Sequence, residues 1–227
     1  MASAKRITRK DIRQPDWFQR TSDLLLNVIE EHRVKAIAAA VALIVILLVI
    51  WGWQVFKARQ DDQAADEFTL AMSLYQEQKY PEAIAAFTKV EAYRWSRYSA
   101  LAHLYETNSY MALNDLDKAI PAGQRFIAAT KPESLFRQIG LVTLADAEER
   151  KGLCKQAVER YAEAANIQAA LKDRALLGKA RCAAQNGDNK TALDAYKEYA
   201  KNQPGAPAPA QIAELEAKVG AAPAEKK

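Results

Sequence analysis

The chain has 227 residues, of which 50% are hydrophobic and 26% are charged, and its formal net charge is +4. The basic excess lies in residues 1–35, and the nearly neutral remainder lacks the basic face expected of a nucleic-acid-binding domain, which argues against that class. Two cysteines, Cys154 and Cys182, are too few for a disulfide-dense scaffold or a four-cysteine zinc site.

The first element, residues 1–33, is expected to be a cytoplasmic basic arm with an amphipathic helix. Residues 1–15 are polar and basic and end at Pro15, and Asp16 can cap a following helix. Apolar residues then recur at helical spacing from Trp17 to Ile29. This helix could lie on the membrane surface, dock on a partner, or only determine topology, and the sequence leaves all three open.

Residues 34–56 predict a transmembrane helix. The stretch from Ala36 to Trp53 reads AIAAAVALIVILLVIWGW and carries no charge. Roughly 20 such residues cross a hydrocarbon core of about 30 Å. Trp51 and Trp53 stand where an interfacial aromatic belt is expected. The run begins too far from the N-terminus for a cleaved signal peptide, so a retained anchor is favoured.

Flanking charge predicts the orientation of this anchor. Eight Lys and Arg residues precede the apolar run, whereas Lys57 and Arg59 after it are followed at once by acidic residues. Positive charge stays on the cytoplasmic side. We therefore expect a cytoplasmic N-terminus and a domain beyond the membrane, which in a Gram-negative bacterium means the periplasm.

Residues 57–204 contain an internal repeat. Four alanines recur at separations of 36, 38 and 35 residues, namely Ala83, Ala119, Ala157 and Ala192. In three units an aromatic residue follows four positions later, namely Phe87, Tyr161 and Tyr196. A small residue lets two helices approach closely, and the aromatic residue fills the adjacent groove. The second unit departs from this pattern with Pro121 and Gly123, and Phe126 is the alternative packing residue.

This pattern resembles the tetratricopeptide repeat, a helix–turn–helix unit of about 34 residues. The resemblance implies an all-α fold in which the transmembrane helix precedes a solenoid of about four helix pairs. Turn residues divide the segment into eight expected helices: about 62–78 with 81–92, 97–112 with 115–129, 133–150 with 153–169, and 172–185 with 188–201.

Residues 205–227 are rich in Ala and Pro and predict a flexible tail. Within it, Ile212, Leu215 and Val219 are spaced for one or two helical turns that would cap the last repeat.

The whole layout resembles the ancillary SecYEG translocon subunit family of bacterial inner membranes. That resemblance implies a single anchor with a cytoplasmic N-terminus, a periplasmic repeat domain, and contact with translocon subunits or periplasmic chaperones.

No catalytic constellation, phosphate-binding loop or metal-ligand pattern is recognisable, and His32 and His103 stand alone in the sequence. We therefore expect no enzyme activity, cofactor or metal. The leading hypothesis is a membrane-anchored adaptor for protein–protein interaction, and the alternative is a self-assembling structural component of a larger cell-envelope complex. Four residues are candidates for contacting a protein ligand: Tyr75, Tyr110, Arg137 and Arg181.

Cys154 and Cys182 are expected at the same end of two adjacent antiparallel helices. A disulfide between them is possible if the helices are suitably staggered, because the Cα atoms must approach within about 7 Å. Two buried thiols are the preferred interpretation.

Overall fold

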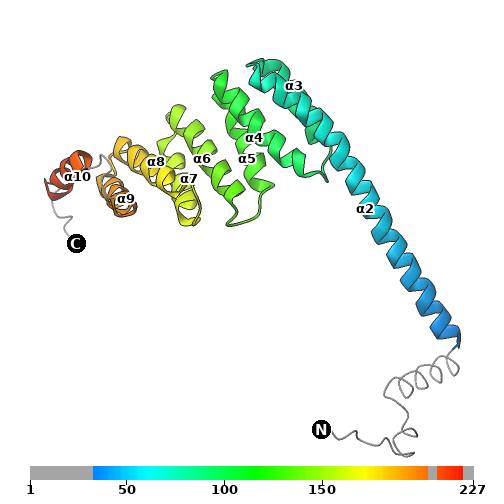
Figure 1. Ribbon diagram of the computed structural model, residues 1–227. Helices are drawn as coiled ribbons and strands as arrows, with labels where there is room; N and C mark the ends of the chain where they lie inside the picture. The colour runs from blue at the N-terminus through cyan, green and yellow to red at the C-terminus, as the bar shows by residue number, and fades with distance from the viewer. Residues whose placement is uncertain (1–32, 204–208, 222–227) are drawn as a thin grey trace, which may run out of the picture. The chain divides into compact units, whose positions relative to one another are not determined.

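The computed structural model describes residues 33–203 and 209–221, and every regular element in these ranges is a helix (Figure 1). The helices are α2 (Arg33–Gln76), α3 (Tyr80–Glu91), α4 (Arg97–Ala112), α5 (Leu116–Ala128), α6 (Leu135–Arg150), α7 (Cys154–Asn166), α8 (Lys172–Gln185), α9 (Asn189–Asn202) and α10 (Pro209–Ala221). The predicted all-α fold is thus confirmed. The basic arm, its amphipathic helix and His32 lie outside the described residues.

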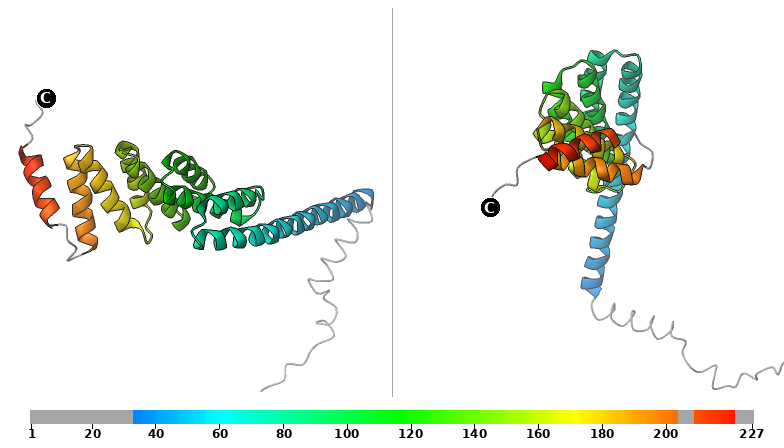
Figure 2. Two further views of the ribbon diagram at one scale, coloured as in Figure 1. Left: turned by 90° about the horizontal axis from the view of Figure 1, so that it is seen from above. Right: turned by 90° about the vertical axis from the view of Figure 1, so that its left-hand side faces the viewer.

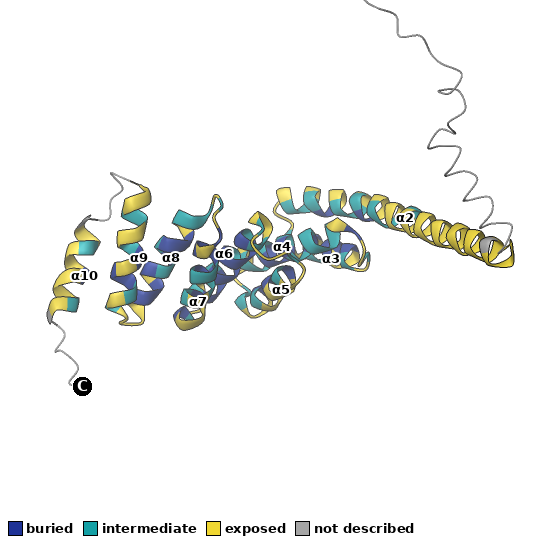
Figure 3. Cartoon of the chain, turned by 90° about the horizontal axis from the view of Figure 1, so that it is seen from below, coloured by how far each residue is buried: buried dark blue, intermediate teal, exposed yellow. Residues whose placement is uncertain are grey.

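Helix α2 joins the predicted transmembrane segment and the first repeat helix into one element of 44 residues. No proline occurs between Phe56 and Gln76 to end the helix, and the residues in this stretch are mostly good helix formers. Between residues 33 and 56 the large apolar side chains are exposed, except for the half-buried Val55 (Figure 3). An 18-residue window of α2 has a mean hydropathy of 2.8 and none of it is buried, so α2 is long and apolar enough to span a membrane.

From Lys57 onward the chain forms a compact unit of helix pairs that follow one another in chain order (Figures 1 and 2). The bounds of α3 to α9 agree with the predicted ones within three residues. Side chains of Ser96, Asp115, Ser134 and Asp188 cap the N-termini of α4, α5, α6 and α9 by accepting backbone N–H bonds. Local signals of this kind explain why the turns were predictable.

Neighbouring repeats interlock through an aromatic ring placed on a glycine. Phe126 of α5 is buried and lies against Gly140 of α6, where an added Cβ would come within 2.6 Å of the ring. Tyr161 of α7 lies against Gly178 of α8 in the same way, and a Cβ there would overlap the ring. Phe126 therefore packs in place of the missing aromatic residue at Gly123.

The buried side-chain amide of Gln138 forms hydrogen bonds with the backbone between the end of α7 and the start of α8. The side chain of Gln138 is fully buried, and its Nε2 donates to the carbonyls of Ala164 at 3.1 Å and Ile167 at 2.8 Å. Its Oε1 accepts from the backbone N–H of Leu171 at 2.9 Å. One residue of α6 thus satisfies three backbone groups where the chain leaves α7, which holds the third and fourth repeats together.

Residues 209–221 of the tail form the helix α10, so the capping turns predicted at Ile212, Leu215 and Val219 belong to a full helix, whereas the other residues of this range were expected to be flexible. Leu215 is buried at 5% exposure and packs with Ala183, Ala192 and Leu193, and Ile212 and Val219 lie beside it. The apolar end of the last repeat supplies the surface that stabilises this helix. The parts of the predicted tail at 205–208 and 222–227 lie outside the described residues.

The contact between Tyr161 and Gly178 yields a stability prediction. Gly178→Ala gains helix propensity, but its methyl group would collide with a ring whose hydroxyl is held by hydrogen bonds. We expect a net loss of about 1–3 kcal/mol in the free energy of unfolding, measured by urea denaturation. Gly220→Ala in α10 is the matched control, since nothing lies within 4 Å of its added Cβ. Equal stability of both variants would disprove the interlock.

Candidate functional site

A polar hollow of about 570 Å³ opens along three helices, α4, α6 and α8. These are the first helices of three successive repeats. We call it the arginine groove, and its lining residues are Asn108, Met111, Thr143, Asp146, Glu149, Arg150, Arg174 and Arg181. Several of these positions repeat at 38 residues, as Asn108 and Asp146 do. The repeat therefore places side chains at equivalent points of neighbouring helices.

Tyr161 of α7 supports two carboxylates of the arginine groove. Its hydroxyl oxygen lies 2.6 Å from Asp146 Oδ1 and 2.7 Å from Glu149 Oε2. One hydroxyl proton can be donated to only one carboxylate at a time, so two negative groups converge on one oxygen. Arg174 pairs with Asp146, and Arg181 donates from Nε and Nη2 to Glu149 at 2.9 and 2.8 Å. These two guanidinium groups balance the two carboxylates.

The pKa values of the groups follow from this arrangement. Burial raises the pKa of Tyr161, and the hydrogen bonds to Asp146 and Glu149 raise it further. Burial alone would raise the pKa of Glu149, but the hydrogen bonds from Arg181 and Tyr161 outweigh it and lower that pKa. The hydrogen bond to Glu149 also raises the pKa of Arg181. The pair of Glu149 and Arg181 therefore stays ionised across the physiological range.

Arg150 gives the arginine groove a surplus positive charge. Its Nη1 donates to the backbone carbonyl of Met111 at 3.3 Å, and among the described residues it makes no ion pair. Three arginines then face two carboxylates, and the side chains of Arg174 and Arg181 are 62% and 49% exposed. Exposed guanidinium groups are suited to binding carboxylates in paired hydrogen bonds.

The four predicted ligand-contacting residues do not lie together. Arg181 lines the arginine groove. Arg137 instead bonds Glu163 and the carbonyl of Ile127, and so links α6 to α7 and to the end of α5. Tyr75 stacks edge-on with Tyr80, Phe87 and Tyr105 in the core of the first repeat. Tyr110 lies under the Lys118 ammonium group, 5.6 Å from its ring centre.

Sequence reasoning missed Asn108, Asp146, Arg150 and Arg174, although a signal for part of the groove existed. Asn108 and Asp146 are 38 residues apart, and so are Thr143 and Arg181. Following this spacing along the first helix of each repeat would have found these two pairs. It would not have shown that Tyr161, from a second helix, supports the carboxylates from below.

The two cysteines are free, buried thiols in the structure. Cys154 Sγ donates to Gln185 Oε1 at 2.9 Å. Burial raises the pKa of Cys182, and its hydrogen bond with Cys154 raises it further. The two thiols are therefore neighbours, the Cys182 thiol stays protonated at neutral pH, and their pairing in an oxidising compartment remains a prediction.

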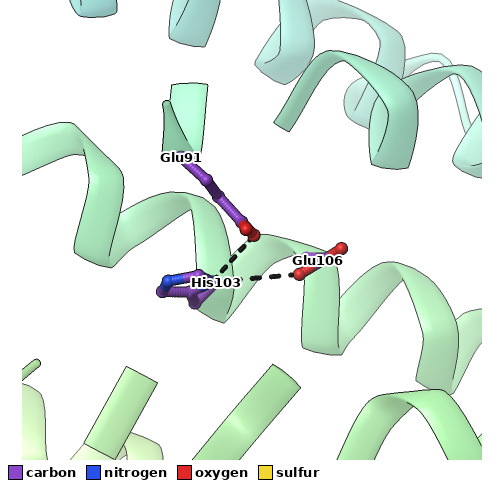
Figure 4. A group of neighbouring side chains, drawn as sticks. All are labelled: Glu91, His103 and Glu106. Carbon is purple, nitrogen blue, oxygen red and sulfur yellow. Dashed lines mark ion pairs between the residues drawn. The ribbon is translucent and has the colours of Figure 1, made fainter. Parts of the chain in front are cut away.

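A second cluster joins α3, α4 and α5 around His103 (Figure 4). His103 Nδ1 lies 2.7 Å from Glu91 Oε1 and 3.9 Å from Glu106 Oε2. Arg125 Nη2 lies 2.6 Å from Glu106 Oε2. Burial lowers the pKa of His103, but the hydrogen bonds with Glu106 and Glu91 outweigh it and raise the pKa to about 9. His103 is consequently a cation at neutral pH.

These three residues are of types that bind metals, and their ligand atoms lie within 4.8 Å of one another. Two positive groups already serve the two carboxylates, however, because both His103 and Arg125 are charged. A metal ion would have to displace the His103 proton and move the guanidinium group away. The arrangement is therefore better explained as an internal ion network that fastens the first two repeats.

The raised pKa of His103 makes stability depend on pH. Its contribution is fully present below pH 6.5, the unperturbed pKa, and is lost as the pH rises through about 9. The difference in unfolding free energy between the wild type and His103→Gln should shrink by roughly 2–3 kcal/mol over that window. Urea denaturation at a series of pH values measures it. A difference that stays constant with pH would show that folding does not raise the pKa of His103.

Comparison with known proteins identifies the repeats. The family model described as tetratricopeptide repeat matches residues 68–134 and 142–207. Among solved structures, a Podosopora anserina protein described as a kinesin light chain with nearly identical TPR-like repeats is similar. It has a TM-score of 0.56 and 17% identity over 70% of this chain and 88% of that chain.

A second crystal structure of these Podosopora anserina repeats gives a TM-score of 0.55 and 16% identity, over 70% of this chain and 88% of that one. At such identities the likeness concerns the fold alone. A comparison with curated protein sequences finds no match. Because the family model covers more than half of the 227 residues, this chain belongs to the tetratricopeptide repeat family.

Proposed function

We propose that this protein is a membrane-anchored adaptor that binds an acidic segment of another protein in the arginine groove. The supporting observation is the surplus guanidinium group of Arg150 beside the exposed Arg174 and Arg181, in a hollow formed by three successive repeats. Tetratricopeptide repeat domains generally bind other proteins, and here the first helix of each repeat contributes to one surface.

The chemistry of the groove favours an extended segment with acidic side chains. A carboxylate of the ligand can pair with Arg150 without breaking an existing ion pair, because the side chain of Arg150 is hydrogen-bonded to a backbone carbonyl and makes no ion pair with another described residue. Asn108, at the α4 side, can both donate to and accept from a ligand backbone. Met111 adds an adaptable apolar contact between these polar groups.

The apolar part of α2 supports attachment to a membrane. Its large side chains are exposed and an uncharged stretch of this length has no other apolar environment within the described chain. Basic residues before it and acidic residues after it favour a cytoplasmic N-terminus and a repeat domain on the opposite side. In a Gram-negative bacterium this places the domain in the periplasm.

The layout resembles the ancillary SecYEG translocon subunit family, and on that basis the partner would be a translocon subunit or a periplasmic chaperone. An adaptor fixed beside the translocon would hold such a chaperone near emerging chains. The alternative, a self-assembling scaffold, is less favoured because α10 covers the apolar end of the last repeat with Leu215. End-to-end stacking of solenoids would need that end open.

Selection from a random peptide library tests the groove. The full chain in detergent should enrich peptides rich in Asp and Glu, because each good charge-assisted contact contributes about 1.5–3 kcal/mol, or roughly tenfold or more in affinity. Arg150→Glu should abolish this enrichment, while Lys190→Glu, on an exposed residue of α9, should leave it unchanged. No enrichment of acidic peptides by the wild type would contradict the proposed ligand.

Topology has its own test. The native thiols are buried, so a surface cysteine is introduced as Lys190→Cys in a chain with Cys154→Ala and Cys182→Ala. After the outer membrane is permeabilised, a membrane-impermeant maleimide should label position 190 in otherwise intact cells. A cysteine at position 3 should be labelled only after lysis. The reverse pattern would place the repeat domain in the cytoplasm and exclude the periplasmic partners.

A further inference from the structure

Two adjoining hollows of the repeat unit are lined by residues that do not belong to the arginine groove. One measures about 640 Å³ and the other about 410 Å³. They share Arg97, Ala100, Ala129 and Lys131, so they form one continuous surface. We call it the loop surface, because it is formed by α2 at Lys57 and Asp61, residues 92–96 with the start of α4, and residues 129–134 with the start of α6.

Exposed apolar side chains gather at this surface. From Lys57 onward, five large apolar residues of the described chain are exposed, namely Leu70, Trp95, Leu113, Leu135 and Phe136. Three of these five belong to the loop surface or its edge: Trp95 is 56% exposed, Phe136 54% and Leu135 47%. Trp and Phe at an exposed loop, beside cations, are typical of a contact with the membrane interface.

The charge of the loop surface is positive. Its lining carries four cations, namely Lys57, Arg94, Arg97 and Lys131, against the single carboxylate of Asp61. That carboxylate is already engaged, since it accepts the backbone N–H of Arg97 at 3.2 Å, and a hydrogen bond with Ser96 lowers its pKa. Glu133 lies within residues 129–134 but does not line either hollow. The balance complements an anionic headgroup layer.

Chain connectivity brings Lys57, one lining residue of this surface, close to the end of the predicted span. Lys57 directly follows the apolar run and lies four residues after Trp53, which is about 6 Å along a helix. The headgroup layer on each side of the hydrocarbon core is itself roughly 5–8 Å thick. Because Lys57 lines the same hollow as Arg94, Trp95 and Lys131, these side chains start within reach of the headgroups.

We infer that the loop surface binds anionic phospholipid headgroups, with Trp95 and Phe136 entering the membrane interface and the four cations contacting the phosphates. The inference rests on the proposed membrane anchor. Lipid contact would hold the repeat unit at the membrane and leave the arginine groove, which lies on other residues, available to a protein ligand.

Lipid quenching of tryptophan tests this on the full chain in vesicles. A chain with Trp17, Trp51 and Trp53 changed to Phe keeps only Trp95, and a companion with Trp17→Phe and Trp95→Phe keeps the two anchor tryptophans. Lipids brominated near the glycerol end should quench Trp95 when about 30% of the lipid is phosphatidylglycerol. Quenching should fall at least twofold in about 0.5 M salt, which screens charge.

Charge reversal provides the matched comparison. Arg94→Glu, Arg97→Glu and Lys131→Glu together should at least halve the quenching of Trp95, because each cation near an anionic surface contributes about fivefold to binding. Lys155→Glu, Lys190→Glu and Lys201→Glu make the same change of net charge on other exposed residues and should have no effect. Circular dichroism confirms that both triple variants keep their helices.

Each other outcome overturns the inference in a distinct way. Quenched anchor tryptophans with an unquenched Trp95 would refute lipid contact and leave the anchor intact. Unquenched anchor tryptophans would refute the anchor and with it the lipid surface. In native membranes, a photoreactive residue at position 136 should give lipid adducts, and a protein adduct in their place would identify the loop surface as a protein contact.

Discussion

The Tyr161 side chain is the interaction on which both the packing and the groove depend. Its ring lies on Gly178 in the core, and its hydroxyl group meets Asp146 and Glu149 at the surface. Those carboxylates hold Arg174 and Arg181. A single residue of α7 therefore joins α6 to α8 and sets the charge pattern of the arginine groove, so a change in repeat packing changes the binding surface as well.

The remaining features extend this arrangement in both directions along the chain. Phe126 on Gly140 repeats the ring-on-glycine contact one repeat earlier, and the ion network of His103 fastens the first two repeats. At the other end, Leu215 of α10 closes the apolar surface of the last pair. Because each repeat contacts only its neighbours, these local contacts together maintain a groove formed from three repeats.

Much of the fold was predictable because its signals are local. The alanine spacing, the turn residues and caps such as Ser134 each act within a few positions, and the predicted helix bounds follow from them. The residues of the arginine groove were harder to predict from the sequence. Arg181, predicted to contact a ligand, lines this groove. Arg137 was predicted on the same grounds, but its side chain is held by Glu163, a partner 26 residues away in the sequence. The helix α10 was underestimated because Ala and Pro indicate flexibility, whereas the buried surface for Leu215 exists only after the repeats stack.

The side-chain Nε–H of Arg181 offers the most direct test of the central role of Tyr161. In the wild type this group donates to Glu149, which Tyr161 holds in place, so its NMR resonance should be sharp and protected from exchange with water. Tyr161→Phe keeps the ring on Gly178 but removes the hydroxyl. We expect the Arg181 resonance then to broaden and to exchange at least several-fold faster, since a hydrogen bond to a charged group is worth about 1.5–3 kcal/mol. A resonance unchanged by Tyr161→Phe would show that the groove is organised without Tyr161.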